Sequence, residues 1–280
     1  MMFDCGEGTQ RQMMRYGVSF ALGDIFFTHF HTDHFLGVLG LLRTLTLQDR
    51  KESLSIWGPK GLVQMLKRAD GLGVERLTFE LEVAEVTPGD PIKRKDYDIL
   101  PFPVEHRAAV AVGYALIEHE RRGIFDPDHA RALGIPEGPL WGRIAKGEAV
   151  TLDDGRVIEP AALVGPTRSG RRVVVTGDTR PCQATIEAAQ GADLIAHEAT
   201  FGDEEAQRAL ETGHSTAREA AEVAASSGAK RLVLTHFSAR YSRDPSELER
   251  QARERFPATT CARDGQEVDV PFSGTPIGQS

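Results

Sequence analysis

Short runs of β-branched and other apolar residues alternate with helix-like patterns along most of the chain. This alternation is typical of an α/β fold, whose buried strands read as continuous apolar runs. Four runs end in titratable residues: 24–28 leads into His29, 172–176 into Gly177-Asp178, 193–196 into His197-Glu198, and 231–235 into His236. Because α/β sheets commonly bind ligands at the carboxyl ends of their strands, we expect these polar side chains to share one site.

Helix-start and helix-stop signals lie between the strands. Thr216-Ala-Arg-Glu219 has capping-box spacing, and Gly228 is expected to end the helix that it opens. Asp244-Pro-Ser-Glu247 predicts another helix, with Pro245 at its first position. Residues 54–57 are expected to form a strand, followed by a turn and a helix over 62–69.

Residues 117–167 break this alternation. Glycine, proline and charged residues dominate there, and Gly134-Ile-Pro-Glu-Gly-Pro139 cannot form the interior of a regular helix or strand. We therefore expect one main domain over 1–272, an inserted and partly mobile arm at 117–167, and a disordered tail at 273–280. Positive and negative charges nearly balance in the arm, so charge alone does not identify it as an RNA-binding surface.

Composition limits the classes of protein that fit. The chain has 280 residues and a formal net charge of −8, which disfavours a protein that coats nucleic acid but not an enzyme with a local basic patch or bound cations. Its three cysteines lack Cys-x-x-Cys spacing and support neither a disulfide framework nor a thiolate metal site. No apolar run approaches the ~20 residues that cross a bilayer. A cytoplasmic protein fits these features best.

The segment His29-Phe-His31-Thr-Asp33-His34 is the strongest chemical signal. Its imidazoles and carboxylate directly follow an apolar strand, and such nitrogen and oxygen donors bind divalent metal ions. His29 and His31 have the spacing that points both side chains the same way in an extended segment, while Asp33 and His34 reach a second position on the turn. The loop can therefore face two metal ions. The alternative is a solvated histidine-rich turn or a helix cap.

Two metal ions need more ligands than one loop supplies. His106, Asp178 and His236 each follow another predicted strand and are the further ligand candidates. Asp178 is the candidate bridging ligand, because its two oxygens can each bind one cation. Taken alone, each of the three could instead be a hydrogen-bonded core or cap residue, but the preceding histidine-rich loop favours the ligand interpretation.

Several segments of the chain form an ordered set of motifs. They are FDCGEGTQRQ at 3–12, THFHTDH at 28–34, VEHR at 104–107, GDTRPC at 177–182, HEATF at 197–201, GHST at 213–216 and THFSARY at 235–241. This set resembles ribonuclease Z, the tRNA 3′-processing endonuclease family of the metallo-β-lactamase superfamily. The histidine-rich loop alone indicates only the superfamily, whereas HEAT, GHST and the arm segment GIPEGPLWGRIAKGE indicate ribonuclease Z.

The resemblance implies a fold and a reaction. The fold would be the αββα four-layer sandwich of the superfamily, with the insertion at 117–167 serving as a tRNA-binding exosite. The reaction would remove the 3′ trailer from precursor tRNA, leaving a 3′-hydroxyl on the tRNA and a 5′-phosphate on the trailer.

Carried over residue by residue, the resemblance implies two Zn²⁺ ions per subunit. His29, His31 and His106 would hold one ion, Asp33, His34 and His236 the other, and Asp178 would bridge them. Asp33 would also position or deprotonate the attacking water, and Glu198 with His214 would protonate the departing 3′ oxygen. The alternatives are that Glu198 only orients a metal ligand and that His214 merely precedes a helix cap.

The resemblance also implies substrate contacts and an assembly. Gly134, Pro136, Gly138 and Pro139 in the arm would bind precursor tRNA, and Arg240 with Tyr241 is a candidate phosphate contact. A homodimer is expected, in which one subunit's arm holds tRNA cut by the other. Family members begin with further strands ahead of the position of Phe3. These amino-terminal strands are missing here either because the start was assigned too late, which is our hypothesis, or because the chain is a genuine truncation.

Two alternatives keep the scaffold but change the function. One is a different hydrolase, such as a thioester hydrolase or a small-molecule phosphodiesterase, which HEAT, GHST and the arm disfavour. The other is an RNA-binding protein without catalysis, which the complete set of candidate ligands disfavours. Zn²⁺, Mn²⁺ and Co²⁺ all suit such donors.

Overall fold

The computed structural model describes residues 1–70, 76–107 and 109–272, and these divide into two compact units. The first unit contains Met1–Ile117 and Arg172–Val270, and the second contains Glu118–Arg171 with Pro271 and Phe272. The tail expected to be disordered, at 273–280, lies outside the described residues. Among the helices in the described ranges, none is long and apolar enough to cross a membrane.

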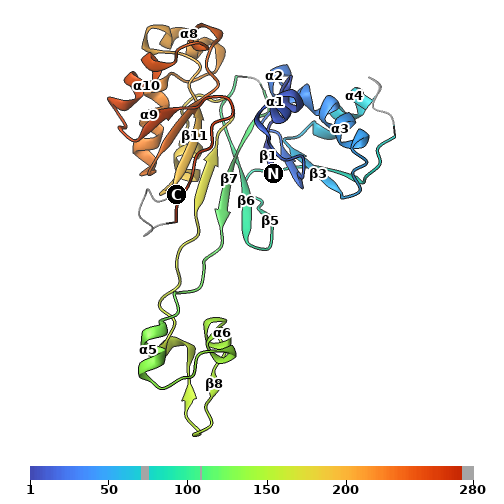
Figure 1. Cartoon of the computed structure of the whole chain (residues 1–280). Helices are drawn as coiled ribbons and strands as arrows, with labels where there is room; N and C mark the ends of the chain where they lie inside the picture. Colours follow the sequence, from blue (N-terminus) through green and yellow to red (C-terminus); the bar gives the residue numbers. More distant parts are fainter. Residues whose placement is uncertain (71–75, 108, 273–280) are drawn as a thin grey trace. The chain divides into compact units, whose positions relative to one another are not determined.

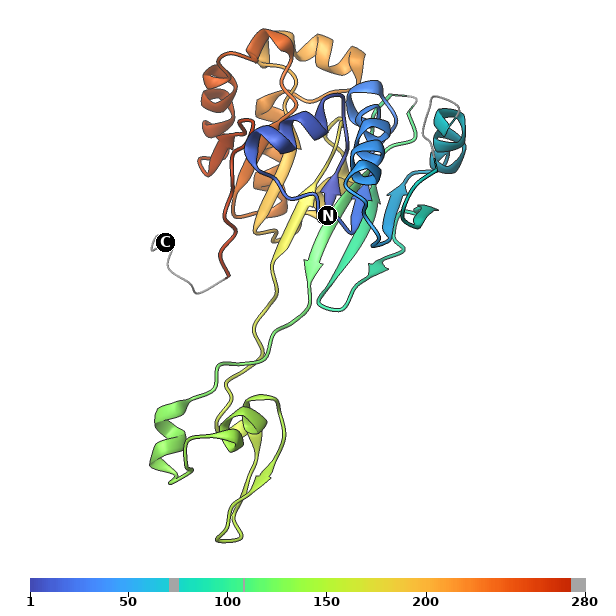
Figure 2. The same cartoon turned by 45° about the vertical axis from the view of Figure 1, so that its right-hand side comes forward.

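One sheet of the first unit is parallel and has the strand order β1-β2-β3-β4 (Figure 1). Its strands are β1 (Met2–Phe3), β2 (Asp24–Phe26), β3 (Leu54–Gly58) and β4 (Leu81–Glu85), and its helices are α1 (Thr9–Tyr16), α2 (Thr32–Phe35), α3 (Gly37–Leu47) and α4 (Leu62–Asp70). Helices α1 and α3 contact each other and lie across this sheet, as Figure 2 shows in blue. The side chains of Ile25 and Phe27 pack beneath them in one apolar cluster.

The other sheet of the first unit has the order β13-β12-β11-β10-β7-β6-β5. Strands β10 to β13 pair in parallel, whereas β10 and β7 pair antiparallel. Helices α7 (Gln183–Ala188), α9 (Ala217–Ser227) and α10 (Ser246–Arg253) pack against this sheet, and α8 (Ala206–Thr212) precedes α9. The strands are β5 (Ile92–Lys93), β6 (Tyr97–Pro103), β7 (Val112–Glu118), β10 (Arg172–Val175), β11 (Leu194–Glu198), β12 (Leu232–Thr235) and β13 (Thr259–Cys261).

The two sheets pack face to face through another apolar cluster, which includes Phe26 and Tyr114. Their rings lie 5.3 Å apart between centroids, and the buried Tyr114 hydroxyl donates a 2.7 Å hydrogen bond to the carbonyl of Phe27. Phe26 therefore faces the second sheet, while Ile25 and Phe27 face the helices, as the alternation of side chains along a strand requires. The resulting order of helices, sheet, sheet and helices is the four-layer α/β sandwich expected from the sequence.

The predicted helix and strand signals are confirmed with one correction. The Thr216 hydroxyl accepts from the backbone N–H of Glu219, the Glu219 carboxylate accepts from that of Thr216, and Gly228 ends α9 with φ = 65°. The prediction that Pro245 is the first residue of a helix is wrong, because α10 begins at Ser246. Pro245 occupies the N-cap position instead. The backbone N–H of Ser246, at the start of the helix, donates to the Asp244 carboxylate.

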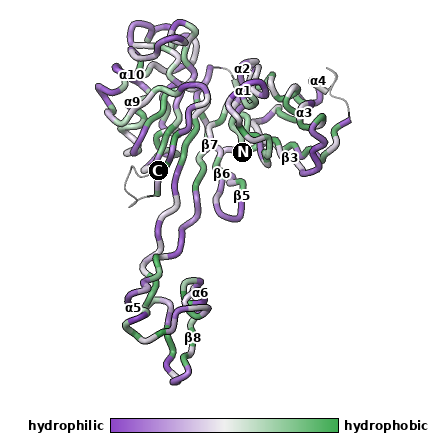
Figure 3. Tube along the Cα trace, viewed as in Figure 1, coloured by the Kyte–Doolittle hydropathy of each residue, from purple (hydrophilic) through white to green (hydrophobic). Residues whose placement is uncertain are grey.

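The second unit has a small apolar core of its own. Its elements are α5 (Pro127–Ala132), α6 (Pro139–Ala145), β8 (Val150–Thr151), β9 (Val157–Ile158) and the 3₁₀ turn η1 (Pro160–Ala162). Ile135, Ile144 and Leu163 are among the residues buried between them. Short hydrophobic segments accordingly appear in this unit in Figure 3, in addition to those along the strands of the first unit. The sequence placed an arm at 117–167, and this separately packed unit covers Glu118–Arg171.

Candidate metal centre

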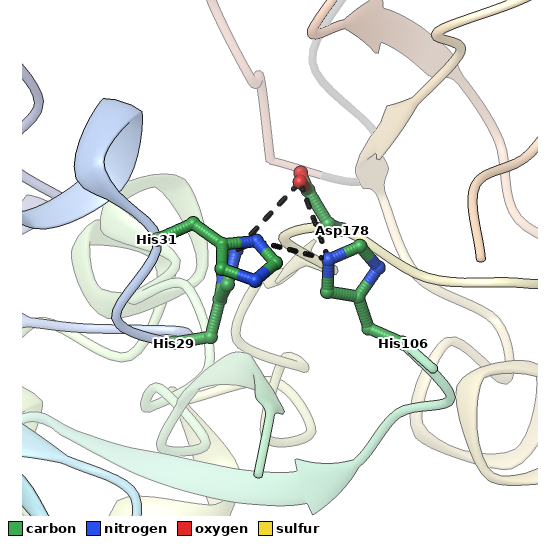
Figure 4. Close-up of side chains that lie close together, drawn as sticks. All are labelled: His29, His31, His106 and Asp178. Carbon is green, nitrogen blue, oxygen red and sulfur yellow. Dashed lines mark hydrogen bonds and ion pairs between the residues drawn. The ribbon is translucent and has the colours of Figure 1, made fainter. Parts of the chain in front are cut away.

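The first cluster of candidate ligands contains His29, His31, His106 and Asp178 (Figure 4). Each offers one ligand atom, and these atoms all lie within 4.8 Å of one another. Nδ1 of His31 is 3.0 Å from Nε2 of His29 and 3.2 Å from Nε2 of His106. Four-coordinate zinc with Zn–N bonds of about 2.0 Å places its ligand nitrogens roughly 3.3 Å apart, so the cluster has the spacing of a metal site.

The second cluster contains Asp33, His34 and His236, and Asp178 lies between the two clusters. Oδ2 of Asp178 is 3.3 Å from Nε2 of His34 and 3.5 Å from Nε2 of His236, and it is also 3.7 Å from Nε2 of His29. Nε2 of His34 and Oδ1 of Asp178 are buried and have no hydrogen-bond partner among the described residues. Buried polar atoms without partners are costly, and a cation bound between them would remove this cost. The residues therefore fit divalent metal ions.

Hydrogen bonds at Nδ1 fix the orientation of four imidazoles. His106 donates to the carbonyl of Gly213 at 2.8 Å, and His34 donates to the Asp4 carboxylate at 2.7 Å. Nδ1 of His29 contacts the Thr28 hydroxyl at 3.0 Å, and that of His236 contacts the Thr200 hydroxyl at 2.9 Å. Both hydroxyls donate to carboxylates, so they accept from the imidazoles. With Nδ1 used in these hydrogen bonds, Nε2 is the nitrogen that each of the four rings turns to the centre, as metal binding requires.

Asp4 supports two of the candidate ligands, His34 directly and His29 through Thr28. Its carboxylate accepts from Nδ1 of His34. It also accepts from the backbone N–H and the hydroxyl of Thr28, at 2.7 and 2.8 Å, and this hydroxyl contacts Nδ1 of His29. Asp4 and His236 both have left-handed backbone conformations, with φ of 55° and 56°. Such conformations in non-glycine residues cost about 1–3 kcal/mol and tend to occur at functional sites. The sequence motif FDCGEG thus contributes an orienting carboxylate.

Two glycines allow this segment to approach the histidine-rich loop. A Cβ atom on Gly6 would lie 2.0 Å from the carbonyl oxygen of Asp33, and one on Gly37 would lie 1.8 Å from the carbonyl oxygen of Gly6. Both distances are far inside van der Waals contact, so no side chain fits at either position. The close approach also forms the hydrogen bond from the backbone N–H of Cys5 to the carbonyl of His34, at 2.8 Å.

Burial and neighbouring charges give His29 and His34 very different pKa values. Burial, followed by the neighbouring His34 ring, lowers the pKa of His29 to about 3, so its imidazole is neutral. For His34 burial also acts to lower the pKa, but the carboxylates of Asp178 and Asp4 together raise it to about 10. A cation that binds Nε2 of His34 therefore has to displace a proton, and metal affinity is expected to fall as the pH falls.

Glu198 and His214 lie beside the second cluster. Oε1 of Glu198 accepts from Nδ1 of His214 at 2.8 Å and from the backbone N–H of Thr179 at 3.0 Å. Oε2 of Glu198 accepts from the Thr200 hydroxyl at 2.7 Å, and this hydroxyl in turn contacts Nδ1 of His236. The two roles considered for Glu198 are therefore both compatible with its contacts: it orients His214 directly and His236 through Thr200.

The candidate substrate residues lie elsewhere. Gly134, Pro136, Gly138 and Pro139 are exposed residues of the second unit, between α5 and α6 or, for Pro139, at the start of α6. Arg240 is exposed on the 3₁₀ turn η3 (Ala239–Tyr241) of the first unit and donates to the buried Glu205 carboxylate at 2.5 Å. The interpretation of Tyr241 as a surface residue is wrong, because it is buried and its hydroxyl donates to Glu204 and Glu205.

The sequence interpretation assigned no role to Asp4, Thr28 or Thr200. All three fall within quoted motifs, FDCGEG, THFHTDH and HEAT, which is the one signal that could have identified them. The hydrogen bonds from Thr28 to Asp4 and between Thr200 and His236 join residues 24 and 36 positions apart in the sequence, so no local spacing rule predicts them.

The chain is similar to known proteins over nearly its whole length. It matches the family model described as "Beta-lactamase superfamily domain" over residues 1–159 and 146–237. It is 61% identical over 271 residues to "Ribonuclease Z" of Gemmatimonas aurantiaca, covering 96% of this chain and 86% of that protein. It is 51% identical to "Ribonuclease Z" of Myxococcus xanthus, covering 97% and 89%. The crystal structure of human tRNase Z, short form, aligns with a TM-score of 0.67 and 27% identity, covering 96% and 88%.

The orienting role of Asp4 leads to a test by substitution. We expect Asp4→Asn to weaken Zn²⁺ affinity about 10- to 100-fold, because the amide cannot accept from Thr28 and His34 as the carboxylate does. Competition with a chromophoric chelator measures the affinity. Asp49→Asn is the matched control, since Asp49 is exposed and has the same left-handed backbone, with φ = 56°. Equal Zn²⁺ affinities for Asp4→Asn and Asp49→Asn would contradict the role of Asp4.

Proposed function

This chain belongs to the ribonuclease Z family of the metallo-β-lactamase superfamily, and on that premise we propose how its residues divide the work of processing tRNA 3′ ends. It is an endoribonuclease of tRNA 3′ processing. The rival functions, another hydrolase or a non-catalytic RNA-binding protein, lose their support, because relatives named ribonuclease Z share 51–61% identity over 96–97% of the chain. The reaction takes place, in our proposal, in the cytoplasm.

Two Zn²⁺ ions per subunit are the proposed cofactors. His29, His31 and His106 would hold one ion, Asp33, His34 and His236 the other, and Asp178 would bridge the pair. The single observation that carries this assignment is the position of the Asp178 Oδ2 atom, within 4.0 Å of Nε2 of His29, His34, His106 and His236. When bound, such a pair of ions supplies Lewis acidity that activates water and neutralises charge on the phosphoryl oxygens.

Asp33 is the residue that we propose to position or deprotonate the attacking water. Its Oδ2 atom lies 3.4 Å from Nε2 of His236 and 3.7 Å from Nε2 of His34, and its side chain is 63% exposed. Contact with His236 holds the pKa of Asp33 well below its usual range, so the carboxylate stays ionised and accepts a hydrogen bond from water.

His214 is the proposed donor of the proton that the departing 3′ oxygen of the tRNA requires. Nδ1 of His214 is held by Glu198, which leaves Nε2 to face the substrate. Because Glu198 accepts from Nδ1, it fixes the orientation of the ring, so that Nε2 is the nitrogen that can pass a proton to the substrate. Expulsion of the 3′ oxygen gives a 3′-hydroxyl on the tRNA and a 5′-phosphate on the trailer.

The second unit is the proposed grip on precursor tRNA. Gly134, Pro136, Gly138 and Pro139 belong to an exposed segment, in which the two prolines have no N–H and the N–H of Gly134 donates to the carbonyl of Arg131. The proposed backbone N–H donor to the RNA is therefore Gly138, which carries no side chain and has φ of 145°. Backbone N–H groups bind phosphate oxygens without reading sequence, as a general processing enzyme requires. Arg240 remains the proposed phosphate contact of the first unit.

A homodimer is the proposed assembly. Large hydrophobic side chains are exposed on α1, α3 and the residues next to them, namely Met14, Tyr16, Val18, Leu36 and Leu47. Apolar side chains that gather on neighbouring elements mark protein interfaces, so this surface is the one that a second copy of the chain would cover.

Removal of the proton donor is expected to slow RNA cleavage without emptying the metal centre. His214→Ala should reduce the single-turnover rate on precursor tRNA about 10²- to 10⁴-fold, the usual contribution of general acid catalysis. Zinc content, measured in parallel, should match that of the wild type, because His214 belongs to neither proposed ligand set. A variant that cleaves at the wild-type rate would rule out this role for His214.

Removal of the second unit should separate substrate binding from chemistry. Arg121 and Arg168 exchange both backbone hydrogen bonds at 2.8 Å, so residues 122–167 can be replaced by a two-residue Asn-Gly turn. We expect KM for precursor tRNA to rise at least about 10-fold, while hydrolysis of bis(4-nitrophenyl) phosphate changes less than about 2-fold. Equal losses on both substrates would refute the proposed grip.

The proposed interface can be tested by charge. Met14→Glu with Val18→Glu should convert a dimer into a monomer, as measured by light scattering, because two like charges per copy would be buried. Leu210→Glu is the control, since Leu210 is exposed on α8, away from these elements in the sequence. A wild-type protein that is monomeric at micromolar concentration would exclude the dimer.

A further inference from the structure

Two loops beside the candidate metal centre, at residues 178–180 and 213–215, are joined by hydrogen bonds at consecutive residues. The backbone carbonyl of His214 accepts a 2.6 Å hydrogen bond from the Arg180 guanidinium, and the Ser215 hydroxyl donates to the carbonyl of Thr179, also at 2.6 Å. The preceding residue, Gly213, accepts from Nδ1 of His106. The segment that carries the proposed proton donor is therefore anchored to the loop that carries Asp178.

Arg180 makes more than this one contact. Its guanidinium also forms a bidentate pair with the Glu219 carboxylate, with one of the two hydrogen bonds at 2.8 Å. Glu219 caps the first turn of α9 by accepting from the backbone N–H of Thr216, at 2.8 Å. The side chains of Arg180 and Glu219 are only 20% and 25% exposed, so the pair is more shielded from water than a surface ion pair. Arg180 thus joins the His214 carbonyl to the start of α9.

The same loop also holds the partner of His214. The backbone N–H of Thr179 donates to Oε1 of Glu198, the oxygen that accepts from Nδ1 of His214. Thr179 therefore holds the carboxylate of Glu198, and its neighbour Arg180 holds the main chain of His214. Both ends of the Glu198–His214 hydrogen bond depend on two consecutive residues.

We propose that Arg180 is a positioning residue for proton donation: it holds the main chain of His214 so that the imidazole meets both Glu198 and the departing oxygen. The inference rests on the proposed role of His214. Arginine suits the task because one planar guanidinium serves a carbonyl and a carboxylate in fixed directions, whereas lysine offers a single charged centre. A lysine at this position keeps the charge and one of the contacts.

A purely structural role for Arg180 makes a different prediction. The backbone N–H of Arg180 donates to the carbonyl of Glu105 at 2.7 Å, next to the candidate ligand His106. If the side chain served only to hold this region together, its loss would disturb the metal centre and slow every substrate. If the Arg180 side chain positions the proton donor, its removal slows cleavage only of substrates whose leaving group needs a proton.

The test compares two precursor tRNAs that differ in one atom at the scissile phosphate, a 3′-bridging oxygen or a 3′-bridging sulfur. Sulfur departs as a thiolate without protonation, so cleavage of this substrate does not need His214. We expect Arg180→Gln to slow single-turnover cleavage of the oxygen substrate about 10- to 100-fold and that of the sulfur substrate less than about 3-fold. Arg180→Lys should restore part of the loss, with zinc content unchanged in both variants.

The controls separate the two proposals. Arg218→Gln removes another arginine of the same region, on α9, that pairs with Asp203 and Glu254 instead, and it should leave both rates unchanged. His214→Ala should show the same dependence on the leaving atom; if it does not, the role of His214 itself fails and the inference falls with it. If His214→Ala discriminates but Arg180→Gln slows both substrates equally, or neither, only the inference about Arg180 is overturned.

Discussion

Mutual repulsion among ligand atoms is the constraint on which the structure depends. Nδ1 of His31 lies 3.0 Å from Nε2 of His29 and 3.2 Å from Nε2 of His106, and Asp178 brings a carboxylate oxygen to 3.7 Å from Nε2 of His29. Ring nitrogens and a carboxylate buried this close together are costly unless cations or shared protons lie among them, so the surrounding fold has to hold the atoms in place. Hydrogen bonds at Nδ1 of four other rings, the left-handed backbone of Asp4 and His236, and the close backbone contacts at Gly6 and Gly37 hold the centre together. The four rings are His29, His34, His106 and His236.

Much of this arrangement could be predicted because it follows local rules. Buried strands read as apolar runs, and the carboxyl ends of β10, β11 and β12 meet because these strands pair in parallel, which brings Asp178, Glu198 and His236 to one edge. The contacts that orient the ligands could not be predicted in the same way. Asp4, Thr200 and Arg180 act through hydrogen bonds to residues far away in the sequence, and Tyr241 is buried by such contacts although it adjoins the exposed Arg240.

The proposed proton donor and one proposed metal ligand are held by the same two side chains, those of Thr200 and Glu198. The Thr200 hydroxyl connects His236, a proposed ligand, to Glu198, which holds His214. Positions of ligand and proton donor are therefore coupled through one hydroxyl and one carboxylate, and a shift of either is transmitted to the other. The residues proposed to grip the substrate belong to a unit with its own core, separate from this coupling.

The account predicts a pair of cations, and anomalous diffraction from crystals of the zinc-loaded protein at the zinc edge tests this most directly. Two peaks should appear about 3.5–4 Å apart, the spacing of two-metal hydrolases, with Asp178 bound to both. One ion should contact His29, His31 and His106, and the other Asp33, His34 and His236. A single peak, or two peaks that do not share Asp178, would contradict the central claim.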